Sequence, residues 1–296
     1  MTSNQIRAWV MRGYIALFFL YLFGPLLIMS ASAFNQSSYP TITPWEGFTV
    51  EWFHELAQND RLVSGFVNSV WIGLGVVALS VPTALAGAIM LMQVSDRVRP
   101  WYYTIVVSPV LVPGVIIGIS TVIFWERFGS LVGLEYETTN NPFFLTIVGQ
   151  STFISAYCML VFIARLQRFD KTQEEAALDL GATHTQVFWK ILIPFLRPAI
   201  LSSIVLAFLT SFENYNTTVF TMVARGTLTT ELAGLARFGV NPSISALAVV
   251  IMGLTLIFAV IYEIKKRREE AVVEASVKRA AMKRRQDTAA AAHGAA

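Results

Sequence analysis

The chain alternates between long apolar blocks and short polar segments, and this alternation predicts six membrane-spanning helices. A transmembrane helix needs about 20 mainly apolar residues, and each block is long enough. The predicted spans are residues 14–34, 64–92, 101–125, 142–164, 196–223 and 244–264. We therefore expect an all-α polytopic membrane protein with a six-helix membrane domain over residues 14–264.

The first apolar block resembles a secretory signal, because Arg7 and Arg12 precede it and Ala31-Ser32-Ala33 resembles a cleavage site. The core of a signal has about 7–15 apolar residues, whereas this block is longer and further spans follow. We interpret it as a retained first helix that follows a cytoplasmic N-terminus, residues 1–13.

Proline and glycine positions indicate where the predicted spans depart from straight, isolated helices. Pro82 lies in the middle of the second span and should kink it. The third span contains Pro109, Pro113 and the pair Gly114-x-x-x-Gly118. The glycine spacing favours close packing against another helix, and the prolines leave open a break in the helix where a substrate passes.

The composition agrees with a membrane protein. The chain is 55% hydrophobic and 14% charged, with a mean hydropathy of +0.57, whereas a soluble domain has about 25% charged residues. The single cysteine, Cys158, excludes a disulfide within the chain. Because it lies in an apolar block, we interpret it as a small buried hydrophobic residue.

The distribution of lysine and arginine predicts which side of the membrane each segment faces. The N-terminus, the 93–100 link, the 165–197 segment and the 265–296 tail hold 18 of the 22 Lys and Arg residues. Cytoplasmic loops carry the excess of these residues. We therefore expect both termini and the 165–197 segment in the cytoplasm, with a basic cytoplasmic tail, and no interaction with nucleic acid.

The polar stretch 174–194 carries its own helix signals. Thr172 followed by Glu175 has the spacing of a capping box, and Gly181 is a typical C-terminal stop. A second short helix is expected over residues 183–193, ending at Pro194. Two helices joined at a glycine suggest a segment held by another protein.

Several kinds of chemistry are excluded by the sequence. No lysine follows a glycine, so the Gly-Lys pair of a phosphate-binding loop is absent. His54, His184 and His293 are scattered without metal-ligand spacing. We find no catalytic constellation and expect no metal and no cofactor in this chain. Any nucleotide that drives it is hydrolysed by another subunit.

The 174–194 stretch resembles the EAA motif of ABC importer permeases. That family pattern is EAA, three residues, Gly, nine residues, Ile, any residue and Leu-Pro. Here Glu175-Ala176-Ala177, Gly181, Ile191 and Pro194 match it, and Ile193 stands in place of leucine. The resemblance implies the type I importer permease fold, with ATP and Mg²⁺ bound by partner ATPase subunits.

In that family the motif forms the coupling helix that docks into a cleft on the ATP-binding subunit. Small Ala176 and Ala177 would permit close approach, and Glu175 would pair with a basic group. The alternative is an amphipathic helix lying on lipid, which favours a Lys- or Arg-rich polar face. Glu174, Glu175 and Asp179 make this helix acidic, so docking is favoured.

A second resemblance, to the spermidine/putrescine branch of these importers and its second permease subunit, covers roughly the second to the sixth span. Its carrying segments are Ser211-Phe212-Glu213-Asn214 and residues 239–248. Relatives have an acidic pair in the first segment, whereas Asn214 replaces one acid here. A monovalent cation is therefore also compatible.

Glu213 is the acidic residue that we single out within a predicted span. It lies roughly 25 Å from the cytoplasmic start of the span at 1.5 Å per residue, in the outer half of a core about 30 Å thick. A carboxylate there should face a partner helix or an aqueous cavity. We expect a path for a cationic substrate formed with Phe212, Asn214, Tyr215 and Asn216. The alternative is a structural hydrogen bond across a subunit interface or a position at the membrane rim.

The resemblance implies a set of partners: two ATP-binding subunits, a second homologous permease, a periplasmic substrate-binding protein and lipid of the bacterial inner membrane. The expected cargo is a small organic cation such as spermidine or putrescine. An opine, an aminophosphonate or a quaternary ammonium compound remains an alternative cargo. An ion-coupled secondary transporter is the alternative from another class.

Overall fold

The structure is a computed structural model that describes residues 3–222, 225–238, 241–257, 260–261, 263–264 and 267. These residues contain no β-strand, only an isolated antiparallel bridge between Asn35 and Phe48. The chain divides into two compact units, residues 1–56 with 240–296 and residues 57–239. The predicted basic tail 265–296 lies outside the described residues, apart from Arg267.

The first unit contains α1 (Ser3–Ser32), α2 (Glu51–Gln58), which ends two residues past the unit, and an apolar helix over Pro242–Ile257. Two side-chain hydrogen bonds join its two chain segments. Ser32 Oγ donates to Ser245 Oγ at 3.0 Å, and Asn241 Nδ2 donates to Glu55 Oε1 at 2.9 Å. Segments about 200 residues apart in sequence are thereby held together within this unit.

The second unit is helical throughout, and its elements follow one another through short loops. Its elements are α3 (Asp60–Gln93), α4 (Arg99–Val107), η1 (Ser108–Leu111), α5 (Gly114–Val132), α6 (Tyr136–Thr139), α7 (Pro142–Leu166), α8 (Thr172–Asp179), α9 (His184–Val187), η2 (Phe188–Leu192), α10 (Ile193–Phe212), α11 (Thr218–Thr221) and α12 (Leu228–Phe238).

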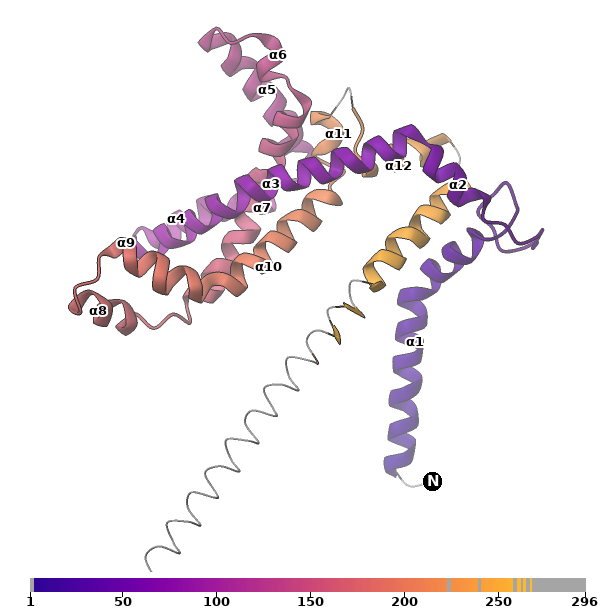
Figure 1. Cartoon of the computed structure of the whole chain (residues 1–296), viewed down its shortest axis with the longest axis horizontal. Helices are drawn as coiled ribbons and strands as arrows, with labels where there is room; N and C mark the ends of the chain where they lie inside the picture. The colour runs from indigo at the N-terminus through magenta and orange to yellow at the C-terminus, as the bar shows by residue number, and fades with distance from the viewer. Residues whose placement is uncertain are drawn as a thin grey trace, which may run out of the picture. The chain divides into compact units, whose positions relative to one another are not determined.

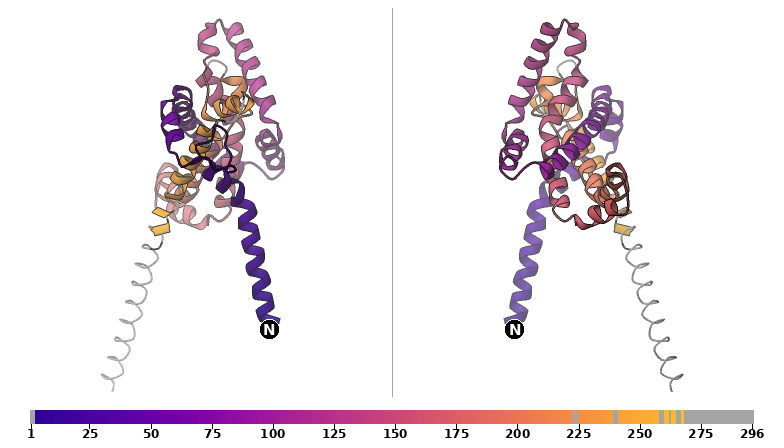
Figure 2. Two further views of the ribbon diagram at one scale, coloured as in Figure 1. Left: turned by 90° about the vertical axis from the view of Figure 1, so that its right-hand side faces the viewer. Right: turned by 90° about the vertical axis from the view of Figure 1, so that its left-hand side faces the viewer.

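The core of the second unit lies where α3, α7 and α10 pack side by side (Figure 1). Ile72, Ile154, Phe162 and Leu196 are at most 1% exposed there. Cys158 is also buried in this core, as the sequence predicts. In Figure 2, α5 and α6 extend together from the rest of the unit. α8 and α9 lie together at the end of this unit away from α11 and α12 (Figure 1).

Five helices of the described chain are long and apolar enough to cross a membrane: Arg7–Ser32, Asp60–Gln93, Gly114–Val132, Pro142–Leu166 and His184–Phe212. The predicted second and fourth spans match two of these helices closely. The predicted first span, 14–34, falls mostly within α1, which begins earlier, at Ser3. The predicted sixth span, 244–264, corresponds to the shorter apolar helix Pro242–Ile257. Beyond residue 257 the chain is described only in part.

The predicted third span, residues 101–125, is not one continuous helix, and the break is the alternative that its prolines left open. The helix α4 ends at Val107, a 3₁₀ turn follows, and α5 begins only at Gly114. Pro109 and Pro113 cause the break, because proline donates no N–H and holds the residue before it in an extended conformation. Val112, with ψ 129°, has that conformation. The membrane-length helix is displaced toward the C-terminus and reaches Val132.

The close packing predicted for the Gly114-x-x-x-Gly118 pair is confirmed. A Cβ added to Gly118 would lie 2.7 Å from the backbone oxygen of Thr217, and one added to Gly114 would lie 3.1 Å from Thr217 Oγ1. Any larger residue at position 118 would therefore push the segment at Thr217 away. The start of α5 packs directly against the chain just before α11.

Candidate functional site

The 172–194 stretch forms the two short helices that the sequence predicts, but its first cap is different. The hydroxyl and the backbone N–H of Thr172 both donate to Asp170 Oδ1, at 2.8 and 3.0 Å. These two bonds lower the pKa of Asp170. The predicted capping box of Thr172 and Glu175 is therefore wrong, because the Asp170 carboxylate is a stronger acceptor placed two residues before the N–H.

Gly181 ends α8 as predicted, in the left-handed conformation at φ +85°. The Gly181 N–H bonds to Leu178 O at 2.9 Å, and the Ala182 N–H bonds to Ala177 O at 3.0 Å. This pair of bonds is a Schellman motif, which favours glycine at the left-handed position. A Cβ there would meet no atom within 4 Å, so the glycine is required by backbone conformation rather than by space.

The helix α8 presents one exposed face. Glu175, Ala176, Asp179 and Leu180 are all exposed, and their spacing places them on the same side of a helix. Leu180, directly after Asp179, is 90% exposed. Leu180 is not a position of the EAA pattern, so the sequence analysis did not single it out. The sequence indicated only that it lies at the end of the helix, directly before the predicted stop at Gly181.

The opposite side of α8 faces the ends of α3, α7 and η2. Ala177 is half-buried, and Glu174 lines a cavity of about 440 Å³ together with Lys171. The rest of this lining comes mainly from the ends of α3, α7 and η2: Ile89, Met92, Gln93, Leu166, Phe169 and Leu192. The predicted coupling residues thus divide into an outward set and an inward set.

The second short helix begins with a capping box that the sequence analysis missed. Thr183 Oγ1 accepts from the Gln186 N–H at 3.3 Å, and Gln186 Oε1 accepts from the Thr183 N–H at 3.0 Å. The signal was present as Thr-x-x-Gln.

The prediction that this second helix ends at Pro194 is wrong. The chain passes through a π-helical turn, Phe188–Leu192, directly into α10, and His184–Phe212 is one continuous helix. Pro194 has no N–H to donate, and the wider turn places the Ile193 N–H on Phe188 O. The short helix at α9 is therefore continuous with a membrane-length helix.

The predicted fifth span also ends early. The helix α10 stops at Phe212 rather than at Val223, which lies outside the described residues. Residues 213–217 form a non-helical link before α11. Asn214 stabilises the link because its Oδ1 accepts from the backbone N–H groups of Thr217 and Thr218 at 3.1 and 3.4 Å. An asparagine in this role favours a new helix start over continuation of the old one.

The five residues predicted to form a substrate path lie at the end of α10 and in this link, with different surroundings. Glu213 and Asn216 are exposed. Tyr215 Oη accepts a hydrogen bond from Arg237 Nη2 of α12 at 3.1 Å. Phe212 packs edge-on against Phe66, with ring centroids 5.7 Å apart. Only Glu213 and Asn216 thus present freely accessible polar groups.

A buried polar network behind the link was not predicted. Gln150 of α7 is 1% exposed and bonds on both sides of the break. Its Nε2 donates to Thr218 Oγ1 at 2.8 Å, and its Oε1 accepts from Ser211 Oγ. Thr146 and Thr221 add a second buried hydroxyl pair at 2.8 Å. The end of α10 and the start of α11 are therefore both attached to α7.

The described residues contain no group of three or more His, Cys, Asp or Glu placed to hold a metal ion. The long apolar helices of the described chain indicate an integral membrane protein that crosses the membrane several times. The chain belongs to the family of binding-protein-dependent transport system inner membrane components. The match to this family covers residues 66–270.

Curated relatives and solved structures agree with this family. The chain is 31% identical over 240 residues to the putrescine transport system permease protein PotI of Escherichia coli K12, covering 79% of this chain and 83% of that protein. It is 25% identical to the spermidine/putrescine permease protein PotC of Haemophilus influenzae, covering 88% and 98%. A bacterial ABC transporter that imports alginate has the same fold, with a TM-score of 0.66 at 21% identity over 88% of this chain and 95% of that one. The predicted fold of a type I ABC importer permease is therefore confirmed.

Proposed function

We propose that this chain is one of two homologous permease subunits of an ATP-driven importer for a small organic cation, most simply a polyamine. It works with two ATP-binding subunits and with a periplasmic binding protein that delivers the substrate. It lies in the bacterial inner membrane, with both termini and α8 in the cytoplasm. ATP and Mg²⁺ are bound by the partner ATPase subunits.

The observation that carries the proposal is the exposed face of α8. Glu175 and Ala176 are matched positions of the motif, Asp179 lies within it, and the neighbouring Leu180 is almost fully exposed. Acidic groups and an exposed leucine on one face favour docking against a protein surface over binding to an anionic lipid surface. The face can therefore receive the ATPase subunit.

The continuity of His184–Phe212 supports a mechanism for transmitting force. When the ATP-binding subunits close, they displace α8. Gly181 and the capped start of α9 connect α8 to this helix, which continues to the 213–217 link. Movement at the cytoplasmic end thus changes the position of the link, and the two permeases alternate between inward-facing and outward-facing states.

The proposed substrate class rests on the relatives and on Glu213. The two relatives with polyamine names are the basis for a cationic substrate. Glu213 places an exposed carboxylate at the helix break, where it can attract a cation. Because Asn214 is occupied in capping α11, Glu213 and Asn216 are the residues that we assign to the path.

The experiment that tests the proposal is reconstitution of the chain with its partner subunits in proteoliposomes. Uptake of labelled putrescine should require ATP and the binding protein, and the tagged chain should co-purify with an ATPase subunit. Uptake by the purified chain alone, driven by an ion gradient, would overturn the ABC assignment. ATP-dependent uptake of another solute with none of putrescine would overturn the polyamine assignment.

Replacing Glu213 by glutamine should lower the rate of putrescine uptake by roughly fivefold to tenfold, since losing one charge contact costs about 1–1.4 kcal/mol. The expected change is in the apparent affinity during transport, measured as uptake against substrate concentration. Glu137→Gln, which removes an exposed carboxylate from α6, is the matched control and should leave uptake unchanged. Equal uptake by both variants would make Glu213 a structural or peripheral group.

A further inference from the structure

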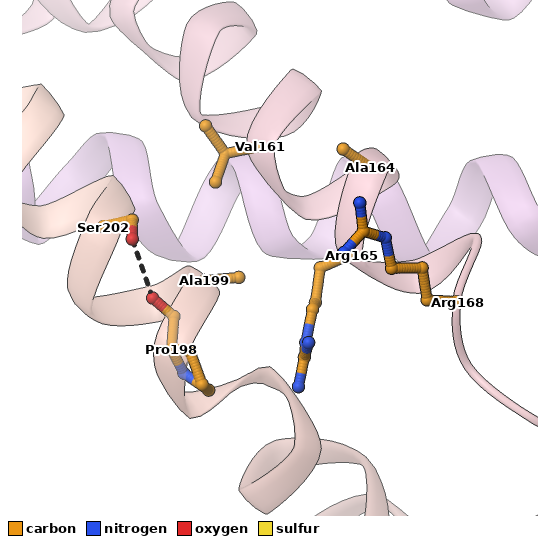
Figure 3. Close-up of a pocket in the computed structure, with 7 residues that line it drawn as sticks. All are labelled: Val161, Ala164, Arg165, Arg168, Pro198, Ala199 and Ser202. Carbon is orange, nitrogen blue, oxygen red and sulfur yellow. Dashed lines mark hydrogen bonds between the residues drawn. The ribbon is translucent and has the colours of Figure 1, made fainter. Parts of the chain in front are cut away.

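A pocket with two arginines lies at the end of α7, apart from both sites described above. Its volume is about 280 Å³, and α7 and α10 form its walls. Figure 3 shows Arg165 on the last turn of α7 and Arg168 in the turn that follows the helix, with Pro198 and Ser202 on the facing helix. The remaining lining is apolar: Val161, Ala164 and Ala199. None of these seven residues is acidic.

Arg165 is fixed in place by α10. Its Nε and Nη2 donate to Phe195 O at 3.2 and 3.1 Å, and its guanidinium lies 4.1 Å from the centroid of the Phe195 ring. A guanidinium carries five N–H donors, so three remain for another acceptor. The bonds to Phe195 hold the group in a defined position at the mouth of the pocket.

Arg168 supplies a second positive charge with no acceptor of its own. Its side chain is exposed and makes no hydrogen bond or ion pair with any part of the chain that the structure describes. Arg165 on α7 and Arg168 in the turn after it line the same pocket, and two like charges repel each other. An anion bound between Arg165 and Arg168 would remove that repulsion, so the pair favours an anionic ligand.

The pocket also changes polarity along the helix. Val161 lies four residues before Arg165, which is about 6 Å further into the apolar span at 1.5 Å per residue. Ser202 lies one turn deeper than Pro198 on the facing helix, and its hydroxyl donates to Pro198 O at 2.9 Å. The cations are thus at the end of the span and the apolar walls run into it. A phospholipid has the same gradient, from a charged head group to acyl chains.

We infer that this pocket binds the head group of an anionic phospholipid such as phosphatidylglycerol, with the phosphate between Arg165 and Arg168 and an acyl chain along Val161 and Ala199. Basic pockets between transmembrane helices on the cytoplasmic side commonly bind such head groups. The inference rests on the proposed function only for the leaflet, because the orientation places this end of α7 at the cytoplasmic face.

The test measures retained lipid rather than transport, so it can fail independently of the importer assignment. The assembled transporter is placed in bilayers containing equal parts of phosphatidylcholine and phosphatidylglycerol, extracted in mild detergent, and analysed for bound lipid by mass spectrometry. Phosphatidylglycerol should be retained selectively. Arg168→Gln should reduce this retention about fivefold, the value of one surface arginine, and Arg168→Lys should preserve most of it.

Arg97→Gln is the matched control, because Arg97 is exposed and lies in the 93–100 link that is predicted to face the same side. The Arg97→Gln variant should retain as much phosphatidylglycerol as the unchanged protein. The assignment would be overturned if Arg168→Gln retained as much phosphatidylglycerol as the unchanged protein. It would also be overturned if Arg97→Gln lost as much as Arg168→Gln. Retention of no phosphatidylglycerol by the unchanged protein would also overturn it. Displacement of the lipid by excess glycerol phosphate would show a site for free anions and would also overturn it.

Discussion

Replacing Glu175 by lysine should reduce ATP-dependent uptake by at least tenfold while leaving the protein inserted in the membrane. Glu175 is exposed on the outward face of α8, a helix that has no buried residue. The substitution therefore affects the partner rather than the fold. Reversing one charge of a buried interface pair costs about 2–5 kcal/mol, which is more than tenfold in binding. The measurement is putrescine uptake together with ATPase activity in the reconstituted complex.

The matched control for Glu175→Lys is Asp96→Lys. Asp96 is another exposed acid, in the link that is predicted to face the same side, and it forms an ion pair with Arg99 at 2.9 Å on the surface. Surface pairs of this kind contribute about 0–1 kcal/mol, so uptake should be almost unchanged. If Glu175→Lys transports as well as Asp96→Lys, the outward face of α8 is not the docking surface.

Replacing Gln150 by leucine should lower the free energy of unfolding by about 1–3 kcal/mol, because Ser211 Oγ would lose the acceptor it uses and Thr218 would lose a donor. Hydrogen bonds between membrane helices average only about 0.6 kcal/mol, but Gln150 makes one on each side of the break. Thermal unfolding of the purified protein in detergent measures the change. Loss of the bonds should also weaken coupling of the 213–217 link to α7, seen as lower uptake at unchanged ATPase activity.

Thr152→Val is the control for Gln150→Leu on the same helix. Thr152 is exposed, and its hydroxyl donates only to Val148 O one turn earlier. Removing it should change the unfolding temperature very little. An unchanged unfolding temperature for Gln150→Leu as well would show that water replaces the amide, and that the network does not hold the broken helix together.

The comparison of sequence with structure shows where local pattern was sufficient. Long apolar blocks at 64–92 and 142–164 became α3 and α7 nearly as predicted, because a helix satisfies every backbone hydrogen bond of an apolar segment. Gly181 ended α8 because only a residue without a side chain enters the left-handed conformation at little cost. These outcomes depend on a few neighbouring residues.

Proline was where local pattern misled. Pro109 and Pro113 broke a predicted span, whereas Pro194 did not end a helix at all. The difference depends on whether the hydrogen bonds around each proline are redirected, because each proline leaves a carbonyl group without its N–H donor. Near Pro194 a π-turn redirected one bond and the helix continued. Near Pro113 the packing of Gly114 and Gly118 against the chain at Thr217 fixed the break.

The sequence by itself determined the class of protein, the spans that became α3 and α7 and the position of the EAA-like stretch, because hydropathy and a spaced motif are properties of the chain. Only the tertiary structure decided how the predicted substrate residues are used. It assigned Asn214 to capping α11 and Tyr215 to Arg237, and it left Glu213 exposed. It also brought Gln150 and Ser211, 61 residues apart, into one network. Such contacts follow from the packing of helices, which no local pattern specifies.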